Sequence, residues 1–258
     1  MSKQHYPIAE TFYSLQGEGL YAGTPMFFIR LAGCNVGKYC YEHPDGELQG
    51  LVTPTQANPV SLAVQTEHSI CTSSLGQTFV CDTDYHTKEK LTAGEIAAHI
   101  SSVGHICITG GEPLMHDLVP LLVALAKHKI IKAPHWIHIE TSGTLPIIDL
   151  FHALPNGTIS ADELWITCSP KEGFMEQNVE CIDEYKFVIN FDTLDDTSNV
   201  VKRILHTTRG VGHKPIYIQP ANPIDSLNTD ALRKAIEFVQ THSFLRLSQQ
   251  HHKSWNLR

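Results

Sequence analysis

The sequence contains no long hydrophobic run and few basic residues. No stretch approaches the roughly 20 apolar residues that cross a bilayer, and residues 1–5 carry no signal-peptide core. Lys and Arg total 19 against 27 Asp and Glu, which gives a formal net charge of -8. A surface that binds nucleic acid in general needs an excess of positive charge. We therefore expect a cytoplasmic protein that binds neither nucleic acid nor membrane.

Closely paired cysteines are also absent. The chain has seven cysteines, and none of them stands in a Cys-x-x-Cys pair. An odd number in a reducing compartment argues against a disulfide framework. A structural zinc site normally has four ligands in tight pairs, whereas iron–sulfur clusters are held by thiolates. From spacing alone, packing, zinc binding and cluster binding all remain open for these cysteines.

What the sequence does contain is a regular alternation of apolar runs and amphipathic segments. Its 258 residues, 42% of them hydrophobic, suffice for one α/β domain over residues 1–258, with no linker and no internal repeat. Alternating strands and helices predict a mostly parallel sheet with right-handed crossovers, arranged as a partial (β/α)6-like barrel. Residues 36–80 read as a long irregular insertion. We expect strands at 26–32, 105–108, 136–140, 164–168, 185–189, 215–219 and 244–247, and helices at 92–103, 118–129, 198–205 and 232–239.

Polar and glycine-rich loops follow several of the expected strands. The loop Thr109-Gly110-Gly111-Glu112-Pro113 places two adjacent glycines where a backbone can approach a ligand closely. Because the carboxyl ends of parallel strands meet at one edge, the loops are expected to share a rim. The other residues placed there are Cys34, Glu140, Thr141, Ser142, Ser169, Pro170, Lys171 and Gln219.

Arg30 interrupts an otherwise apolar strand. A buried arginine needs a carboxylate or phosphate partner. The sequence leaves two alternatives open for Arg30: a partner within the protein, or an acidic ligand.

The motifs taken together resemble the 7-carboxy-7-deazaguanine synthase (QueE) family of radical S-adenosylmethionine (SAM) enzymes. The ordered resemblance runs from about Ile8 to the C-terminus. The motifs that carry it are Ser14-Leu-Gln-Gly-Glu-Gly19, Phe28-Ile-Arg-Leu-Ala-Gly-Cys-Asn35, Cys81-Asp-Thr-Asp-Tyr85, Thr109-Gly-Gly-Glu-Pro113, Glu140-Thr-Ser-Gly143 and Ser169-Pro-Lys171.

The resemblance implies a radical SAM lyase with a [4Fe-4S] cluster, SAM and Mg²⁺ as cofactors. In this family a 5′-deoxyadenosyl radical abstracts hydrogen from 6-carboxy-5,6,7,8-tetrahydropterin. Ring contraction and loss of ammonia then give 7-carboxy-7-deazaguanine, a precursor of 7-deazaguanines such as queuosine. The resemblance also implies an electron donor such as flavodoxin and a homodimer.

Site residues are carried over by position. The cluster ligands are expected to be Cys34, Cys71 and Cys81, and the Mg²⁺ ligand Thr83. Residues expected to contact SAM are Gly111, Glu112, Thr141, Ser142, Ser169, Pro170, Lys171 and Gln219. Residues expected to contact the substrate are Leu15, Gln16, Gly17, Arg30, Thr109 and Arg258.

The chain departs from the family pattern at the middle cluster ligand. The family has a cysteine three residues before the last one, where this chain has Thr78. The middle ligand is then Cys71 or Cys40. We favour Cys71, because a short hairpin over residues 71–81 would bring it back to Cys81.

Other metal-binding side chains are expected to have ordinary roles. We interpret Cys107, Cys168 and Cys181 as packing residues. His251 and His252 are interpreted as part of a solvated tail.

Two other functions remain as alternatives. One is another small radical SAM enzyme, such as an activase that takes hydrogen from a partner protein. That function needs neither a pterin-binding Leu15-Gln16-Gly17 loop nor a Mg²⁺ ligand such as Thr83. The other is a zinc-stabilised binding module with structural cysteines, which would stay colourless when supplied with iron and sulfide.

Overall fold

The computed structural model covers most of the chain. The described residues are 4–37, 39–42, 48–52, 63–64, 69–81, 83, 88–100, 104–127, 134–210 and 212–257, and of those between 38 and 68 only the backbone is described. Within these ranges, no helix combines the length and the apolar character needed to span a membrane.

The centre of the molecule is a nine-stranded sheet in the order β14-β13-β12-β11-β10-β9-β2-β1-β8. From β2 to β14 every neighbouring pair is parallel, which confirms the predicted α/β class with a mostly parallel sheet. Among the described strands, β14 and β8 are the two edges, so the sheet is an open one. The parallel strands are β2 (Pro25–Leu31), β9 (His105–Gly110), β10 (Ile137–Thr141), β11 (Leu164–Cys168), β12 (Glu184–Ile189), β13 (Ile216–Pro220) and β14 (Arg246–Leu247).

Two antiparallel strands extend the sheet at the β2 side. β1 (His5–Leu15) pairs with β2 and, through its first half, with β8 (Glu89–Thr92). β8 leads directly into α1 (Ala93–Ala98), where Thr92 and Glu95 form the predicted capping box. The helix ends at Ala98, earlier than the expected residue 103.

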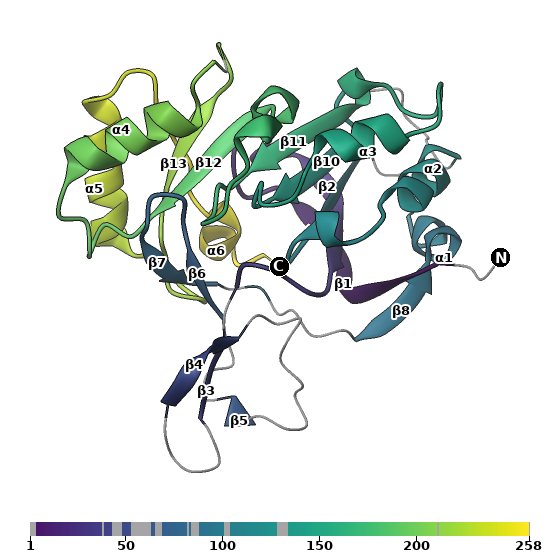
Figure 1. The fold of residues 1–258 in the computed structure, drawn as a ribbon, viewed down its shortest axis with the longest axis horizontal. Coiled ribbons are helices and arrows are strands. Elements are labelled where there is room, and N and C mark those ends of the chain that lie inside the picture. The colour runs from purple at the N-terminus through teal and green to yellow at the C-terminus, as the bar shows by residue number, and fades with distance from the viewer. Residues whose placement is uncertain are drawn as a thin grey trace.

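Helices α1 and α2 lie towards one end of the sheet, and α4 and α5 lie towards the other (Figure 1). The expected helices at 118–129, 198–205 and 232–239 correspond to α2, α4 and α5. Two further helices, α3 and α6, were not predicted. The bounds are α2 (Val119–Lys127), α3 (Ile148–Ala153), α4 (Thr197–Thr207), α5 (Thr229–Gln240) and α6 (His251–Trp255), with 3-10 turns at Pro113–Met115, Ala161–Glu163 and Glu176–Cys181.

The two faces of the parallel sheet have different compositions. Residues that alternate along each strand, such as Phe27, Ile29 and Leu31 of β2, belong to the main hydrophobic core. The residues between them face the other way, because side chains in a strand alternate with period two. On that second face, Met26, Phe28 and Cys107 form a small separate apolar cluster.

The segment predicted to be irregular contains short strands instead. A three-stranded sheet forms from β3 (Tyr39–Glu42), β4 (Leu48–Val52) and β5 (Ala63–Val64), and it stands apart from the central sheet (Figure 1). A hairpin follows, made of β6 (Ile70–Thr72) and β7 (Thr78–Val80). The short hairpin expected around Cys71 is therefore present, and the other described parts of the insertion include short strands that were not predicted. The strands of this segment are only two to five residues long, too short to show the alternation of apolar and polar residues that marks a strand.

Candidate functional site

A cavity of about 530 Å³ lies on the second face of the sheet. Five strands each contribute a polar side chain to its lining. Each of these side chains alternates along its strand with residues of the main core. This inner row consists of Arg30 (β2), Thr109 (β9), Glu140 (β10), Lys186 (β12) and Gln219 (β13).

Three thiols lie at one side of the cavity. Cys34 follows β2, Cys71 is on β6 and Cys81 follows β7, and all three line the cavity. A hydrogen bond with Cys81, together with burial, raises the pKa of the Cys71 thiol above its usual value. Burial also raises the pKa of Cys34, and Cys81 adds to that effect. The three sulfurs that the sequence separates by up to 47 positions are thus electrostatic neighbours.

The remaining cysteines are distributed as packing residues would be. Cys168 is buried in the main core, Cys107 is buried in the smaller cluster, and Cys181 packs against the main core. The side chain of Cys40 lies outside the described residues.

The glycine loop after β9 fits against the turn that carries Cys34. Gly111 donates its N–H to the carbonyl of Leu31 at 3.2 Å, and Glu112 donates to the carbonyl of Gly33 at 3.1 Å. A β-carbon on Gly111 would lie 2.8 Å from the Cys34 β-carbon. Only glycine allows this approach.

Glu112 does not line the cavity but supports residues that do. Its carboxylate is fully buried and accepts hydrogen bonds from the Thr141 hydroxyl and the Ser142 N–H, both at 2.8 Å, and from the Ser142 hydroxyl. Thr141 and Ser142 both face the cavity. Glu112 therefore orients the loop after β10.

The loop after β11 joins this rim to the cysteine hairpin. Ser169 donates its N–H to Thr141 O at 2.8 Å, and Lys171 donates to Ser142 O at 3.2 Å. On its other side, Pro170 O accepts from Ser74 N at 2.9 Å. Ser169 and Lys171 line the cavity, whereas Pro170 contributes this backbone contact.

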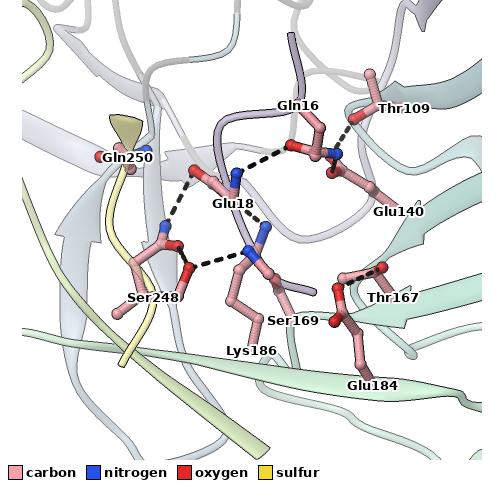
Figure 2. Close-up of polar contacts among 12 residues, drawn as sticks. Gln16, Glu18, Thr109, Glu140, Thr167, Ser169, Glu184, Lys186, Ser248 and Gln250 are labelled. Atoms are coloured by element: carbon pink, nitrogen blue, oxygen red, sulfur yellow. Dashed lines mark hydrogen bonds and ion pairs between the residues drawn. The ribbon is translucent and has the colours of Figure 1, made fainter. Parts of the chain in front are cut away.

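Glu140 connects two of the expected substrate residues. Its carboxylate accepts hydrogen bonds from Gln16 Nε2 at 3.1 Å and from the Thr109 hydroxyl at 2.8 Å (Figure 2). Leu15 and Gly17, the neighbours of Gln16 in the chain, also line the cavity. Sequence reasoning placed Glu140 on the rim but gave it no role, although the Glu140-Thr-Ser-Gly143 motif marked it.

Arg30 has a partner within the protein and also faces the cavity. Its Nε donates to Glu10 Oε1 at 2.9 Å, and its Nη1 lies 3.4 Å from the Thr83 hydroxyl. Phe12 packs beneath the guanidinium, 5.9 Å from the ring centre, and stacks on Phe28. Arg30 therefore has the partner within the protein that was one of its two alternatives. Because it also lines the cavity, the other alternative, an acidic ligand, stays open. Thr83 is itself buried and lines the cavity.

The C-terminal segment folds back onto the cavity as α6. His251 donates its N–H to Gly17 O at 3.0 Å, and His252 lines the cavity. The interpretation of these histidines as a solvated tail was wrong, because it ignored a contact with a residue more than 230 positions away. Arg258 lies outside the described residues.

A buried ion pair lies in the middle of the inner row. The Lys186 ammonium binds the Glu18 carboxylate, which also accepts from Gln219 Nε2 at 3.1 Å (Figure 2). Next to it, Glu184 accepts from the Thr167 hydroxyl and from Leu20 N, both at 2.9 Å. Sequence reasoning missed Glu18 and Lys186, since neither has a local partner.

The comparisons with known proteins extend over nearly the whole chain. It is 32% identical to the 7-carboxy-7-deazaguanine synthase of Synechocystis sp., over 98% of this chain and 94% of that protein. The chain belongs to the 7-carboxy-7-deazaguanine synthase family. The Escherichia coli K12 synthase is 31% identical over 98% of this chain and 99% of its own length. No protein-family model matches the sequence.

The structural comparison agrees with this membership in the 7-carboxy-7-deazaguanine synthase family. The crystal structure of QueE from Escherichia coli superposes with a TM-score of 0.58, at 26% identity, over 95% of this chain and 94% of that one. The predicted family and α/β fold are therefore confirmed.

Proposed function

We propose that this chain is a 7-carboxy-7-deazaguanine synthase. It acts as a carbon–nitrogen lyase that converts 6-carboxy-5,6,7,8-tetrahydropterin into 7-carboxy-7-deazaguanine with loss of ammonia, in the biosynthesis of 7-deazaguanines such as queuosine. The observation that carries this function is one cavity that brings three thiols together with Gln16, Arg30 and Thr109. Membership in the family supports the same assignment.

The three thiols fit an iron–sulfur cluster. Thiolates are the usual ligands of such clusters, and here Cys34, Cys71 and Cys81 face one cavity from three separate segments. We assign them as ligands of a [4Fe-4S] cluster with one iron left for SAM. When bound, the cluster and SAM supply the radical chemistry that removes a hydrogen atom from the substrate.

The thiol side of the cavity is the proposed SAM site. The residues that line it there are Gly111, Thr141, Ser142, Ser169 and Lys171, with Gln219 in the inner row. Gly111 lines the cavity beside Cys34, because the absence of a β-carbon lets its loop pack against the turn at Gly33 and Cys34. Glu112 and Pro170 act through their neighbours.

The opposite side is the proposed substrate site. Arg30, oriented by Glu10, presents a fixed guanidinium that suits the pterin carboxylate, since arginine binds carboxylates through charge-assisted hydrogen bonds. Leu15, Gln16, Gly17 and Thr109 line the wall beside it. Glu140 holds Gln16 and Thr109 in place and accepts hydrogen bonds from both.

Thr83 lines the cavity next to Arg30. Its hydroxyl is a suitable oxygen ligand for Mg²⁺, a hard cation that keeps several waters. We assign Thr83 as that ligand and Arg258 as a further substrate contact. We also propose a single domain over residues 1–258, a cytoplasmic homodimer and an electron donor such as flavodoxin, on the resemblance to the family.

Anaerobic turnover tests the function. The protein, reconstituted with iron and sulfide, is mixed with reductant, SAM, Mg²⁺ and the carboxypterin, and ammonia and the deazapurine are measured. We expect a brown protein that forms both products in equal amounts. A brown protein that cleaves SAM without forming the deazapurine would instead support a different radical SAM activity. A colourless protein that retains zinc would support the binding module.

A further inference from the structure

The loop between β1 and β2, residues 16–24, crosses the cavity face of the sheet, and we call it the strap. Its ends are closed by hydrogen bonds of 2.8 Å from Gln16 N to Thr24 O and from Gly23 N to Gln16 O. Between them, Gly19 N donates to the Ser248 hydroxyl at 3.2 Å. The strap is thus held by side chains from distant parts of the sheet.

Glu18 connects the strap to several distant residues at once. Lys186 and Gln219, on β12 and β13, bind its carboxylate from the sheet. Gln250, the residue just before α6, also hydrogen-bonds to it, and His252 of α6 adds an attractive charge. One carboxylate therefore contacts the sheet (Figure 2) and also Gln250, the residue that precedes the C-terminal helix.

The ion pair is well shielded from water. The side chains of Lys186 and Glu18 are only 7% and 13% exposed. Burial alone would raise the pKa of Glu18, but the Lys186 ammonium and His252 hold that pKa well below its usual value. Removing the lysine from such a pair leaves an uncompensated buried charge, which is far more costly than losing a surface pair.

The strap also touches α6 directly through Gly17. A β-carbon on Gly17 would lie 2.7 Å from His252 Nδ1 and 3.0 Å from the His252 backbone nitrogen. The backbone of the strap and the first turn of α6 are therefore in close contact. Gln16, Gly17 and His252 all line the cavity.

We infer that the Glu18–Lys186 ion pair is a positioning device that holds the strap and α6 together on the cavity. Glu18 belongs to the strap and hydrogen-bonds to Gln250 just before α6, and Lys186 keeps its carboxylate charged and in place. The pair thereby fixes the position of Gln16 and Gly17 relative to His252, with which Gly17 is in contact, in the wall of the cavity. The identity of the substrate rests on the proposed function, whereas the coupling of the two segments does not.

Lys186→Met tests the coupling, because methionine keeps most of the side-chain volume and removes the charge. Amide hydrogen exchange of residues 250–257 is measured by mass spectrometry, and KM and kcat for the carboxypterin are measured on the reconstituted enzyme. We expect exchange in this segment and KM both to rise by about tenfold or more, with a smaller change in kcat. The double variant Glu18→Gln with Lys186→Met removes both charges of the pair and should recover much of both losses.

Two further variants separate positioning from general stability. Arg233→Met breaks an exposed ion pair to Glu237 of 2.8 Å on α5 and should leave both measurements unchanged. Gly17→Ala displaces α6 by steric contact alone and should raise KM with the ion pair intact.

The outcomes distinguish the coupling from the function. If Lys186→Met lowers the melting temperature but leaves exchange at 250–257 and the substrate KM as in the wild type, the pair is merely structural and the inference is wrong. If exchange rises as expected while the wild-type enzyme does not turn over the carboxypterin, the coupling is supported and the proposed function fails.

Discussion

A β-carbon added to Gly111 would lie 1.8 Å from the carbonyl oxygen of Gly33. No real β-carbon tolerates this distance, and the atom in the way is backbone rather than a flexible side chain. The glycine loop after β9 and the turn before Cys34 thus fit together only because residue 111 has no side chain. The fit places the loop directly beside one of the three thiols.

Gly111→Ala should therefore disrupt the thiol side of the cavity. The loop must move away from Gly33 and Cys34, so we expect a loss of about 2–4 kcal/mol in the free energy of unfolding, as for other overpacked sites. Iron content after reconstitution should fall as well. Chemical denaturation and iron analysis measure the two effects.

Gly94→Ala is the matched control for this substitution. Gly94 lies in the first turn of α1, and a β-carbon there meets no heavy atom within 4 Å. Alanine has less backbone freedom to lose on folding than glycine, so this variant should be unchanged or gain up to about 1 kcal/mol in the free energy of unfolding. An equal loss in both variants would contradict the steric explanation.

Cys71→Ala should abolish the cluster, whereas Cys40→Ala should not. Cys71 is hydrogen-bonded to Cys81 and lines the cavity with Cys34. The measurement is the visible spectrum and iron content of each anaerobically prepared variant, with Cys181→Ala as a control outside the cavity. Loss of the cluster in the Cys40 variant alone would make Cys40 the middle ligand.

Arg30→Lys should weaken substrate binding without disturbing the fold. Lysine keeps the positive charge but cannot bind a carboxylate with a planar fork while also binding Glu10. We expect KM for the carboxypterin to rise by about 10- to 100-fold and the KM for SAM to stay the same. Arg233→Lys on the exposed face of α5 serves as the control. An equal rise in both KM values would place Arg30 outside the substrate site.

His138 should make the protein less stable in acid. Burial, with His105 and His135 nearby, lowers the pKa of His138 from 6.5 to about 3. The unfolded chain therefore binds one more proton than the folded chain between about pH 6.5 and 3, so the contribution of His138 to stability is complete above that window and is lost as pH falls through it. The loss amounts to about 1.4 kcal/mol per pH unit at most.

Urea denaturation at several pH values checks this expectation. The free energy of unfolding of His138→Gln should depend less steeply on pH between about 6 and 4 than that of the wild type. Comparison with the wild type separates His138 from other groups that titrate in the same range. Parallel curves for the two proteins would show that His138 is charged in the folded state or does not contribute.

Much of the fold was predictable because its strands are short apolar runs separated by helices. The runs at 105–108 and 164–168, for example, became β9 and β11 with little change in their bounds. The capping box at Thr92 and Glu95 also marked a helix start correctly. These features depend on neighbouring residues, which a sequence shows directly.

The inner row was harder to foresee. The sequence analysis singled out only Arg30 as a charge within a strand, yet β12 carries Lys186 between Tyr185 and Phe187. Its partner Glu18 is 168 positions away, on a loop whose sequence suggests only a turn. No local pattern reveals such a pair, because each charge is explained only by the other.

The cysteines show the same limit. Cys71 does not have the family spacing. It was favoured over Cys40 as the middle ligand only because a short hairpin would bring it back to Cys81. The hairpin β6–β7 is present, and it brings Cys71 beside Cys81. The α6 helix was missed because its contact with Gly17 joins the two ends of the chain.

The alternation along the parallel strands limits how the gene can change in length. Losing or gaining one codon within β9, β10 or β12 would turn every following side chain of that strand to the opposite face. Thr109, Glu140 or Lys186 would then enter the main core, and isoleucine or phenylalanine would line the cavity. Such changes should be tolerated only in the connecting loops.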